Sequence, residues 1–347
     1  MTTRRPLLKD VAARAEVSLT TVSIVLNGKA GTNIPADTQA RVVAAAAELG
    51  YRPNAMARGL RRRRSDTIGV ISDEIATTPF AGAMLQGAQD AAWEAGVVLL
   101  LVNTARDREM EARAIELMLD RQVDAIVYAT MYHQVIEPPP ALREVRSVLM
   151  DARTADGSLP SVVPDDYAAA CEAVEHLLAR GHRRIGFINT AERVPAADER
   201  LDGYRSVLER HGIPFDEVLV VDGESGDTHA GLEAAGRLLD LEARPTALFC
   251  FNDRVAMGAY RAIRLRGLRV PDDVSVVGFD NMEQIAPWLD PPLTTMQLPH
   301  YEMGRWAVEH VLADLRGELA GMPVQKRMPC PIVVRDSVAA PGRVAAP

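Results

Sequence analysis

The feature that most constrains this fold is an alternation that begins at Thr67, where short apolar runs are separated by longer amphipathic segments. Unbroken apolar runs are typical of strands buried on both faces, and helices between such strands are typical of a parallel sheet. The runs expected as strands are 68–71, 97–102, 125–128, 147–150, 185–188, 218–221, 247–251 and 274–279. The segments expected as helices are 81–95, 109–119, 168–180, 201–210, 230–239 and 255–266.

The number of expected strands is more than one open sheet usually holds. The 347 residues are also about twice the usual size of a domain. We therefore expect an α/β body over 66–347, made of two lobes with parallel sheets, with chain crossings near 164, 292 and 324. A closed eight-stranded barrel has the same number of strands and helices and remains the alternative.

The first fifty residues predict short helices instead. Apolar residues recur at helical spacing over Leu8–Ala15, and Ser18 is placed to cap a second helix over 19–26. A third helix is expected over Pro35–Leu49, with Gly50 at its end. We expect an all-α domain over 1–50 whose first two helices form a helix-turn-helix.

Charge is distributed unevenly along the chain. Residues 1–65 carry 12 Lys and Arg against 4 Asp and Glu, whereas the remaining residues carry 27 against 43. A basic head on an acidic body is typical of a head that binds a polyanion, with a basic tail that has no specific partner as the alternative. The segment 51–65, which ends in Arg61–Arg64 and Ser65, is expected to be a hinge helix and linker.

No motif of catalysis is present. The sequence lacks GxSxG, GxxxxGK[ST] and HExxH, and no strand is followed by GxGxxG. Its three cysteines and seven histidines have no metal-ligand spacing, so we expect no enzyme, no cofactor and no metal site. No apolar run approaches the roughly 18 residues of a membrane span, and the N-terminus lacks a signal-peptide core. A cytoplasmic protein without a membrane partner is expected.

The segment 8–28 (LKDVAARAEVSLTTVSIVLNG) resembles the DNA-binding head of the lactose-repressor (LacI/GalR) family of bacterial transcription regulators. The resemblance covers essentially the whole chain in one order. It continues through LGYRPNAMARGL at 49–60, TIGV at 67–70, RGHRRIG at 180–186, RLDGY at 200–204, FNDRVAMG at 251–258, VGFD at 277–280 and PPLTT at 291–295.

This resemblance implies a helix-turn-helix head, a hinge helix and a body similar to two-lobed periplasmic sugar-binding proteins. Such regulators bind pseudo-palindromic operators in double-stranded DNA, and a small effector, most often a sugar, enters the cleft between the lobes. The tail after Arg335 has no leucine heptad, which favours a homodimer over a tetramer. We expect a repressor. The alternative is a two-lobed α/β enzyme or a solute-binding protein without a role in DNA regulation.

The resemblance also assigns DNA contacts. Leu19, Thr20 and Ile24 would read bases, while Thr21 and Ser23 would lie nearer phosphates. Many members have Arg at the position of Ile24, and Arg is the usual reader of guanine. The operator is therefore not expected to copy that of relatives. The remaining residues of the expected DNA-binding set are Ser18, Asn27, Ala57, Arg58 and Leu60.

Leu60 would be the hinge residue that opens a base step in the minor groove. Gly59 stands where Ser is more usual in the family, and a glycine disfavours an isolated helix by roughly 0.5–1 kcal/mol relative to Ala. A hinge that becomes helical only on DNA fits this composition.

Polar residues at strand ends are the expected effector site. Asp165 matches the Asp of the family's Asp-Asn-x-x-Gly motif, with Asp166 in place of the Asn. Carboxylates and an arginine suit a hydroxyl-rich ligand, and aromatic rings suit the face of a sugar. Helix caps or braces between the lobes are the alternative roles. The expected effector-binding residues are Phe80, Asp151, Asp165, Arg200, Asn252, Asp280 and Trp288.

Overall fold

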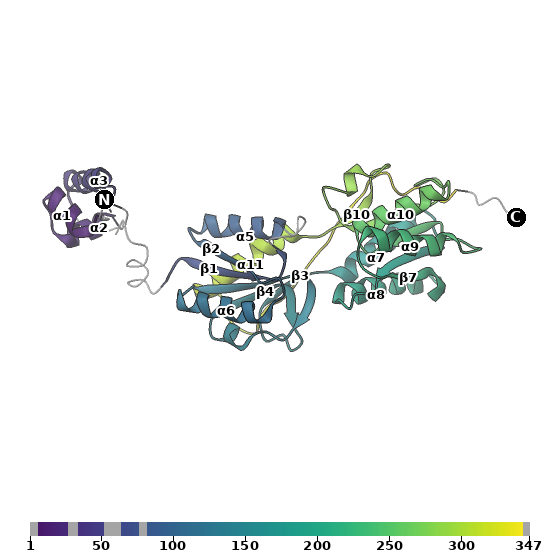
Figure 1. The fold of residues 1–347 in the computed structure, drawn as a ribbon, viewed down its shortest axis with the longest axis horizontal. Coiled ribbons are helices and arrows are strands. Elements are labelled where there is room, and N and C mark those ends of the chain that lie inside the picture. The colour runs from purple at the N-terminus through teal and green to yellow at the C-terminus, as the bar shows by residue number, and fades with distance from the viewer. Residues whose placement is uncertain (1–5, 27–33, 52–63, 76–81, 343–347) are drawn as a thin grey trace. The chain divides into compact units, whose positions relative to one another are not determined.

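The computed structural model describes residues 6–26, 34–51, 64–75 and 82–342 (Figure 1). The chain divides into two compact units, Met1–Asp66 and Thr67–Pro347, which we call the head and the body. No described helix is long and apolar enough to cross a membrane.

The described part of the head contains three helices, as expected. They are α1 (Leu8–Ala15), α2 (Leu19–Leu26) and α3 (Ala36–Leu49). Val11 and Ala12 of α1 are buried against Val22 of α2. The side chain of Ser18 caps α2, because its Oγ accepts a hydrogen bond from the backbone nitrogen of Thr21 at 3.0 Å. This small core fixes which face of α2 remains available to a partner.

The first lobe of the body has a six-stranded parallel sheet in the order β11-β5-β4-β3-β1-β2. Its strands are β1 (Thr67–Ser72), β2 (Val98–Asn103), β3 (Ala125–Ile136), β4 (Arg146–Thr154), β5 (Ser161–Pro164) and β11 (Gln325–Met328). Its helices are α5 (Gly82–Glu94), α6 (Arg108–Asp120) and α11 (His300–Leu315), with the short turn η3 (Pro140–Arg143).

The second lobe has a six-stranded sheet in the order β12-β10-β9-β8-β6-β7, parallel except for β12. Its strands are β6 (Ile185–Thr190), β7 (Val220–Gly223), β8 (Ala247–Cys250), β9 (Ser275–Asp280), β10 (Thr294–Gln297) and β12 (Ile332–Val333). Its helices are α7 (Asp166–Ala179), α8 (Pro195–Arg210), α9 (Thr228–Leu239) and α10 (Asp253–Leu265), with the short turns η4 (Glu217–Leu219) and η5 (Ala286–Trp288).

Helices cover both faces of each sheet. In the first lobe, α5 and α11 share one apolar core with the sheet, and α6 packs against the other face. In the second lobe, α9 and α10 cover one face while α7 and α8 cover the other. Two open, doubly wound sheets are therefore confirmed, and the eight-stranded barrel is excluded.

Several elements differ from the expectation. Strands β5, β10, β11 and β12 and helix α11 were not anticipated. The chain crosses between the sheets after Pro164, as expected, but again within 298–299 and within 329–331 rather than near 292 and 324. The later positions arise because Thr294–Gln297 still pairs with β9 and Gln325–Met328 still pairs with β5.

Two glycines allow α5 and α11 to approach closely. A Cβ at Gly87 would overlap the backbone carbonyl of Tyr301, and a Cβ at Gly304 would overlap that of Met84. Backbone atoms cannot move aside as a flexible side chain can. The packing of these two helices therefore depends on the missing Cβ atoms.

We expect Gly87→Ala to lower the free energy of unfolding of the body by about 1–3 kcal/mol, because the added methyl group overpacks the contact between the helices. Gly82→Ala is the matched control, since a Cβ there meets nothing within 4 Å. It should change the stability by less than about 1 kcal/mol. Urea unfolding followed by tryptophan fluorescence measures both. Equal effects of the two substitutions would contradict this account.

Candidate functional site

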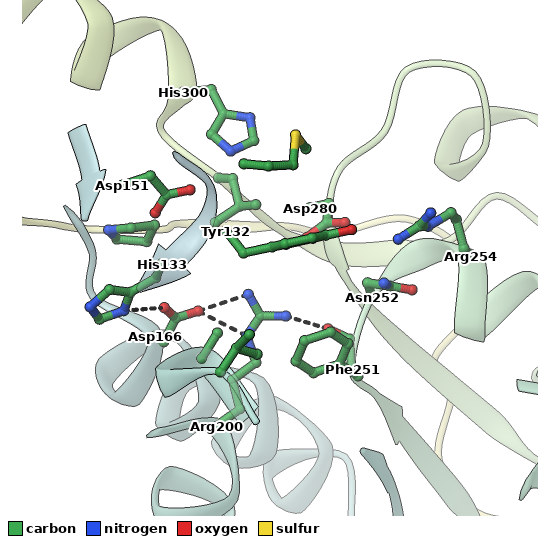
Figure 2. Close-up of a pocket in the computed structure, with 15 residues that line it drawn as sticks. Tyr132, His133, Asp151, Asp166, Arg200, Phe251, Asn252, Arg254, Asp280 and His300 are labelled. Atoms are coloured by element: carbon green, nitrogen blue, oxygen red, sulfur yellow. Dashed lines mark hydrogen bonds and ion pairs between the residues drawn. The ribbon is translucent and has the colours of Figure 1, made fainter. Parts of the chain in front are cut away.

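A polar pocket lies where strands of both sheets end (Figure 2). His133 and Asp151 come from β3 and β4 of the first lobe, while Asn252 and Asp280 stand at the ends of β8 and β9 in the second. The carboxyl ends of parallel strands are where open α/β sheets bind ligands. The pocket is lined by Met131, Tyr132, His133, Asp151, Pro164, Asp166, Val194, Ala196, Arg200, Phe251, Asn252, Arg254, Asp280, Leu298 and His300.

A buried ion pair stands at the centre of this pocket. The Nε and Nη2 atoms of Arg200 lie 2.8 and 2.7 Å from Oδ1 of Asp166, and its Nη1 donates to the carbonyl of Phe251. The guanidinium also lies over the ring of Phe279, 3.5 Å from its centroid. Arg200 is only 4% exposed. Most of the hydrogen-bond donors of Arg200 are therefore bonded to other residues of the protein rather than left for a ligand. Removal of either Arg200 or Asp166 would leave the other charge buried without a partner.

The other oxygen of Asp166 faces His133. Burial raises the pKa of Asp166, but the charge of Arg200 and the neighbouring imidazole of His133 outweigh burial and hold this pKa below its usual value. Nδ1 of His133 lies 3.6 Å from Oδ2 of Asp166, which is too long for a hydrogen bond. Among the described residues, neither ring nitrogen of His133 has a hydrogen-bond partner, nor does Oδ2 of Asp166.

Asp151 places a buried carboxyl group on the lining of the pocket. Its backbone is left-handed, with φ of 55°, and is held by Thr130, whose Oγ1 donates to the Asp151 carbonyl at 2.6 Å. Its Oδ1 is buried without a hydrogen-bond partner among the described residues. Burial first, and then the charge of Asp166, raise the pKa of Asp151 well above its ordinary value, while Arg200 opposes them.

Asp280 is the second acid with a raised pKa that lines the pocket. It ends β9 with φ of 107°. Burial raises its pKa to about 7, and the charges of Arg200 and Arg254 oppose that shift. The two acids with raised pKa values, Asp151 and Asp280, are able to accept hydrogen bonds from a ligand rich in donors.

The side chain of Asn252 forms hydrogen bonds mainly within the protein. Its Oδ1 accepts a hydrogen bond from the nitrogen of Val255 at 2.8 Å and so caps α10. Its Nδ2 donates to the carbonyl of Gly226 at 2.9 Å. Asn252 lines the pocket, but its side chain also fixes the start of a helix.

Not every expected effector residue reaches this pocket. The structure brings together Asp151, Arg200, Asn252 and Asp280. Asp165 instead caps α7, accepting a hydrogen bond from the nitrogen of Ala168 at 3.2 Å. Since Asp165 occupies the cap position, the following residue, Asp166, enters the pocket.

Two aromatic residues, Trp288 and Phe80, were expected to stack on a sugar ring. Trp288 is 80% exposed in the short turn η5 and does not line the pocket, so the structure does not bring it together with the other expected effector residues. Phe80 lies outside the described residues.

The sequence reasoning also missed pocket residues. The principal ones are Tyr132, His133, Asp166, Arg254 and His300. Tyr132 and His133 were missed because β3 extends to Ile136, well past the expected end at residue 128. His300 was missed because α11 was not anticipated. The signal available for Asp166 was its position directly after Asp165 at the end of a strand.

In the head, α2 exposes its first residues. Ser18, Leu19 and Thr20 are exposed, whereas Thr21, Ser23 and Ile24 are partly covered. Val22 is fully buried and holds the opposite face of the helix against the head core. The expected DNA contacts Asn27, Ala57, Arg58 and Leu60 lie outside the described residues.

Comparison with known families gives two matches that together span most of the chain. Residues 7–54 match the model for bacterial regulatory proteins of the lacI family. Residues 65–325 match the model for periplasmic binding proteins and the sugar-binding domain of the LacI family.

Individual relatives align over nearly their whole length. The chain is 35% identical to the HTH-type transcriptional repressor CytR of Escherichia coli K12 over 341 residues, which covers 96% of each chain. It is also 35% identical to the sucrose operon repressor of Shigella flexneri, covering 95% of this chain and 99% of that protein.

Solved structures show the same architecture. The lac repressor dimer bound to operator and an anti-inducer superposes with a TM-score of 0.82 at 27% identity, covering 97% of this chain and 100% of that one. A complex of the regulator CelR with cellobiose superposes with a TM-score of 0.68 at 30% identity, covering 96% and 100%.

The raised pKa of Asp151 predicts the sign of a pH effect. The folded protein holds a proton that the unfolded chain releases, so this group's stabilising contribution is lost as the pH rises above its ordinary pKa toward the folded one. Asp151→Asn removes the titration. Without added ligand, its melting temperature relative to the wild type should rise by at least about 2 °C between about pH 5 and about pH 8.

Differential scanning calorimetry measures this difference, and Asp202→Asn is the control because Asp202 is exposed on α8. A difference between Asp151→Asn and the wild type that stays constant with pH would show that the Asp151 carboxyl does not titrate as described.

Proposed function

Because the chain belongs to the LacI family of bacterial regulatory proteins, we propose that its body controls its head: a small molecule bound in the pocket changes the operator affinity of a homodimeric repressor. Both family matches and the repressors aligned over the whole chain support this function. The observation that carries the effector role is a polar pocket at the strand ends of both lobes.

The exposed start of α2 supports the assignment of the DNA-reading residues. In a helix-turn-helix, the first residues of the second helix meet base edges in the major groove. Leu19 is 51% exposed there, and Thr20 beside it is exposed as well. Ile24 offers only apolar contact, which suits a thymine methyl group better than guanine. Ser18, Thr21, Ser23 and Asn27 complete the proposed contacts of the head.

The hinge is proposed from the sequence. Ala57, Arg58 and Leu60 match the family's hinge helix, in which the leucine enters the minor groove. We propose that this segment carries the coupling between pocket and head, because it joins the two units along the chain.

Exposed apolar groups on the body support dimerisation through it. Strand β2 is the edge of its sheet, and its residues Val98 and Leu101 are 64% and 39% exposed. Trp93 at the end of α5 is 82% exposed. An uncovered edge strand with apolar side chains is typical of a surface that another chain covers. A two-fold dimer also matches a pseudo-palindromic operator.

The chemistry of the pocket supports a sugar as the effector. The carboxyl groups of Asp151 and Asp280 accept hydrogen bonds, and sugar hydroxyls donate them. CelR is a relative whose structure contains cellobiose, and another relative is named for a sucrose operon. CytR, the sucrose operon repressor and the lac repressor are named as repressors, which supports a role without catalysis in the cytoplasm, where operator DNA is found.

The test of this function is a pair of substitutions in the head. An operator is first selected from genomic fragments with the purified full-length protein. We expect Leu19→Ala to weaken binding to that operator roughly tenfold, because a base contact is lost, while binding to random DNA changes by less than about twofold. Fluorescence anisotropy at one salt concentration measures both affinities.

Val43→Ala is the matched control. Val43 is an apolar residue of α3 with 55% exposure, close to that of Leu19, and it lies outside the reading helix. Its substitution should leave both affinities unchanged. If Leu19→Ala weakens operator and random DNA equally, then α2 does not read the sequence.

A further inference from the structure

Three potential metal ligands from separate elements meet beside the ion pair of the pocket. His133 belongs to β3 of the first lobe, Asp166 begins α7, and Glu199 lies on α8 of the second lobe. Each offers a ligand atom, and these atoms all lie within 4.8 Å of one another. His133, Asp166 and Glu199 are separated from one another by 33 residues in turn, so no short sequence motif identifies them as a set.

The buried members of this cluster have polar atoms without hydrogen bonds to the described residues, although they lie within ion-pair distance of each other. His133 is 2% exposed and Asp166 is fully buried. Both ring nitrogens of His133 and Oδ2 of Asp166 lack a hydrogen-bond partner among the described residues. Polar atoms buried without partners cost free energy, and they usually indicate a bound group. Figure 2 shows the imidazole and the carboxylate turned toward each other.

The separation of these two groups suits a shared ion. Ligand atoms about 2.1 Å from a tetrahedral Zn²⁺ lie about 3.4 Å from each other. Nδ1 of His133 and Oδ2 of Asp166 are 3.6 Å apart, longer than a hydrogen bond and close to this ligand spacing. Arg200 binds only Oδ1 of Asp166, which leaves Oδ2 for the ion.

We propose that His133, Asp166 and Glu199 bind a divalent transition-metal ion of the Zn²⁺ class at the boundary of the two lobes. One imidazole and two carboxylates form a ligand set suited to Zn²⁺ or Co²⁺, whereas Mg²⁺ prefers oxygen ligands alone. Three protein ligands leave a coordination position open toward the pocket. The ion joins β3 to α7 and α8, so it favours one relative position of the lobes.

Arg327 competes with the ion for Glu199. It lies on β11 of the first lobe, and its Nη1 and Nη2 atoms contact the Glu199 carboxylate at 2.7 and 2.9 Å. The ion must therefore take one carboxylate oxygen from this pair. This competition gives the site a signature that a surface metal site would lack: removal of Arg327 should strengthen metal binding.

The test uses the full-length protein without an affinity tag, treated with a chelator and titrated with Zn²⁺ by isothermal calorimetry. We expect one ion per chain. His133→Ala and Glu199→Gln should each weaken binding at least about tenfold, and Arg327→Ala should strengthen it several-fold. Co²⁺ should show a visible absorption band that His133→Ala removes, and Mg²⁺ should not displace Zn²⁺.

His229→Ala is the control for binding at the surface, because His229 is exposed and lies 3.4 Å from Glu233 on α9. It should leave the affinity unchanged. The proposal is overturned if the wild type binds no ion at one per chain, or if His133→Ala and Glu199→Gln bind as the wild type does. Should His133→Ala fail to fold, Glu199→Gln and Arg327→Ala decide the outcome.

The proposed metal site does not depend on the proposed repressor function. Measuring Zn²⁺ binding and operator binding on the same protein distinguishes the two proposals. Operator binding measured on the metal-free protein tests the repressor function without the ion. Intact operator binding without stoichiometric Zn²⁺ binding would overturn only the metal site. Zn²⁺ binding without operator binding would overturn only the repressor function.

Discussion

The ion pair between Asp166 and Arg200 is the interaction on which the pocket depends. It joins the first residue of α7 to α8, and the bond from Arg200 to the carbonyl of Phe251 extends it to the end of β8. A buried pair contributes little net stability, yet loss of one partner typically costs about 3–5 kcal/mol. The pair therefore fixes the geometry of the second lobe around the pocket.

The same pair determines which groups remain for a ligand. Burial raises the pKa values of Asp151 and Asp280, and because Arg200 is bonded to Asp166, its charge only partly offsets this effect. Both also have left-handed backbones, with φ of 55° and 107°. Unpaired acids and unusual backbone angles at one place are typical of a binding site, where stability is given up for function.

The strands and helices that hold the core could be predicted because their apolar runs are long and regular. Strands β5, β10, β11 and β12 could not. β10, for example, contains two threonines and a glutamine, and Thr295 donates a hydrogen bond to the buried Asp253 at 2.6 Å. Asn252 and Asp280 were anticipated because they lie in family motifs at strand ends, and Arg200 because it matches the family's arginine in the RLDGY motif. The choice of Asp166 over Asp165 depends on which residue caps α7, and that is decided by backbone geometry.

The central claim is that a ligand in this pocket changes operator affinity. Its most direct test is operator affinity measured on the wild type and on Asp280→Asn during titration with mono- and disaccharides. Asn keeps the shape of the side chain but loses the charge that strengthens hydrogen bonds from hydroxyls. The account predicts a sugar that shifts the operator affinity of the wild type and requires at least about tenfold more ligand for Asp280→Asn, with unchanged affinity in its absence. A shift at the same sugar concentration in both proteins would contradict it.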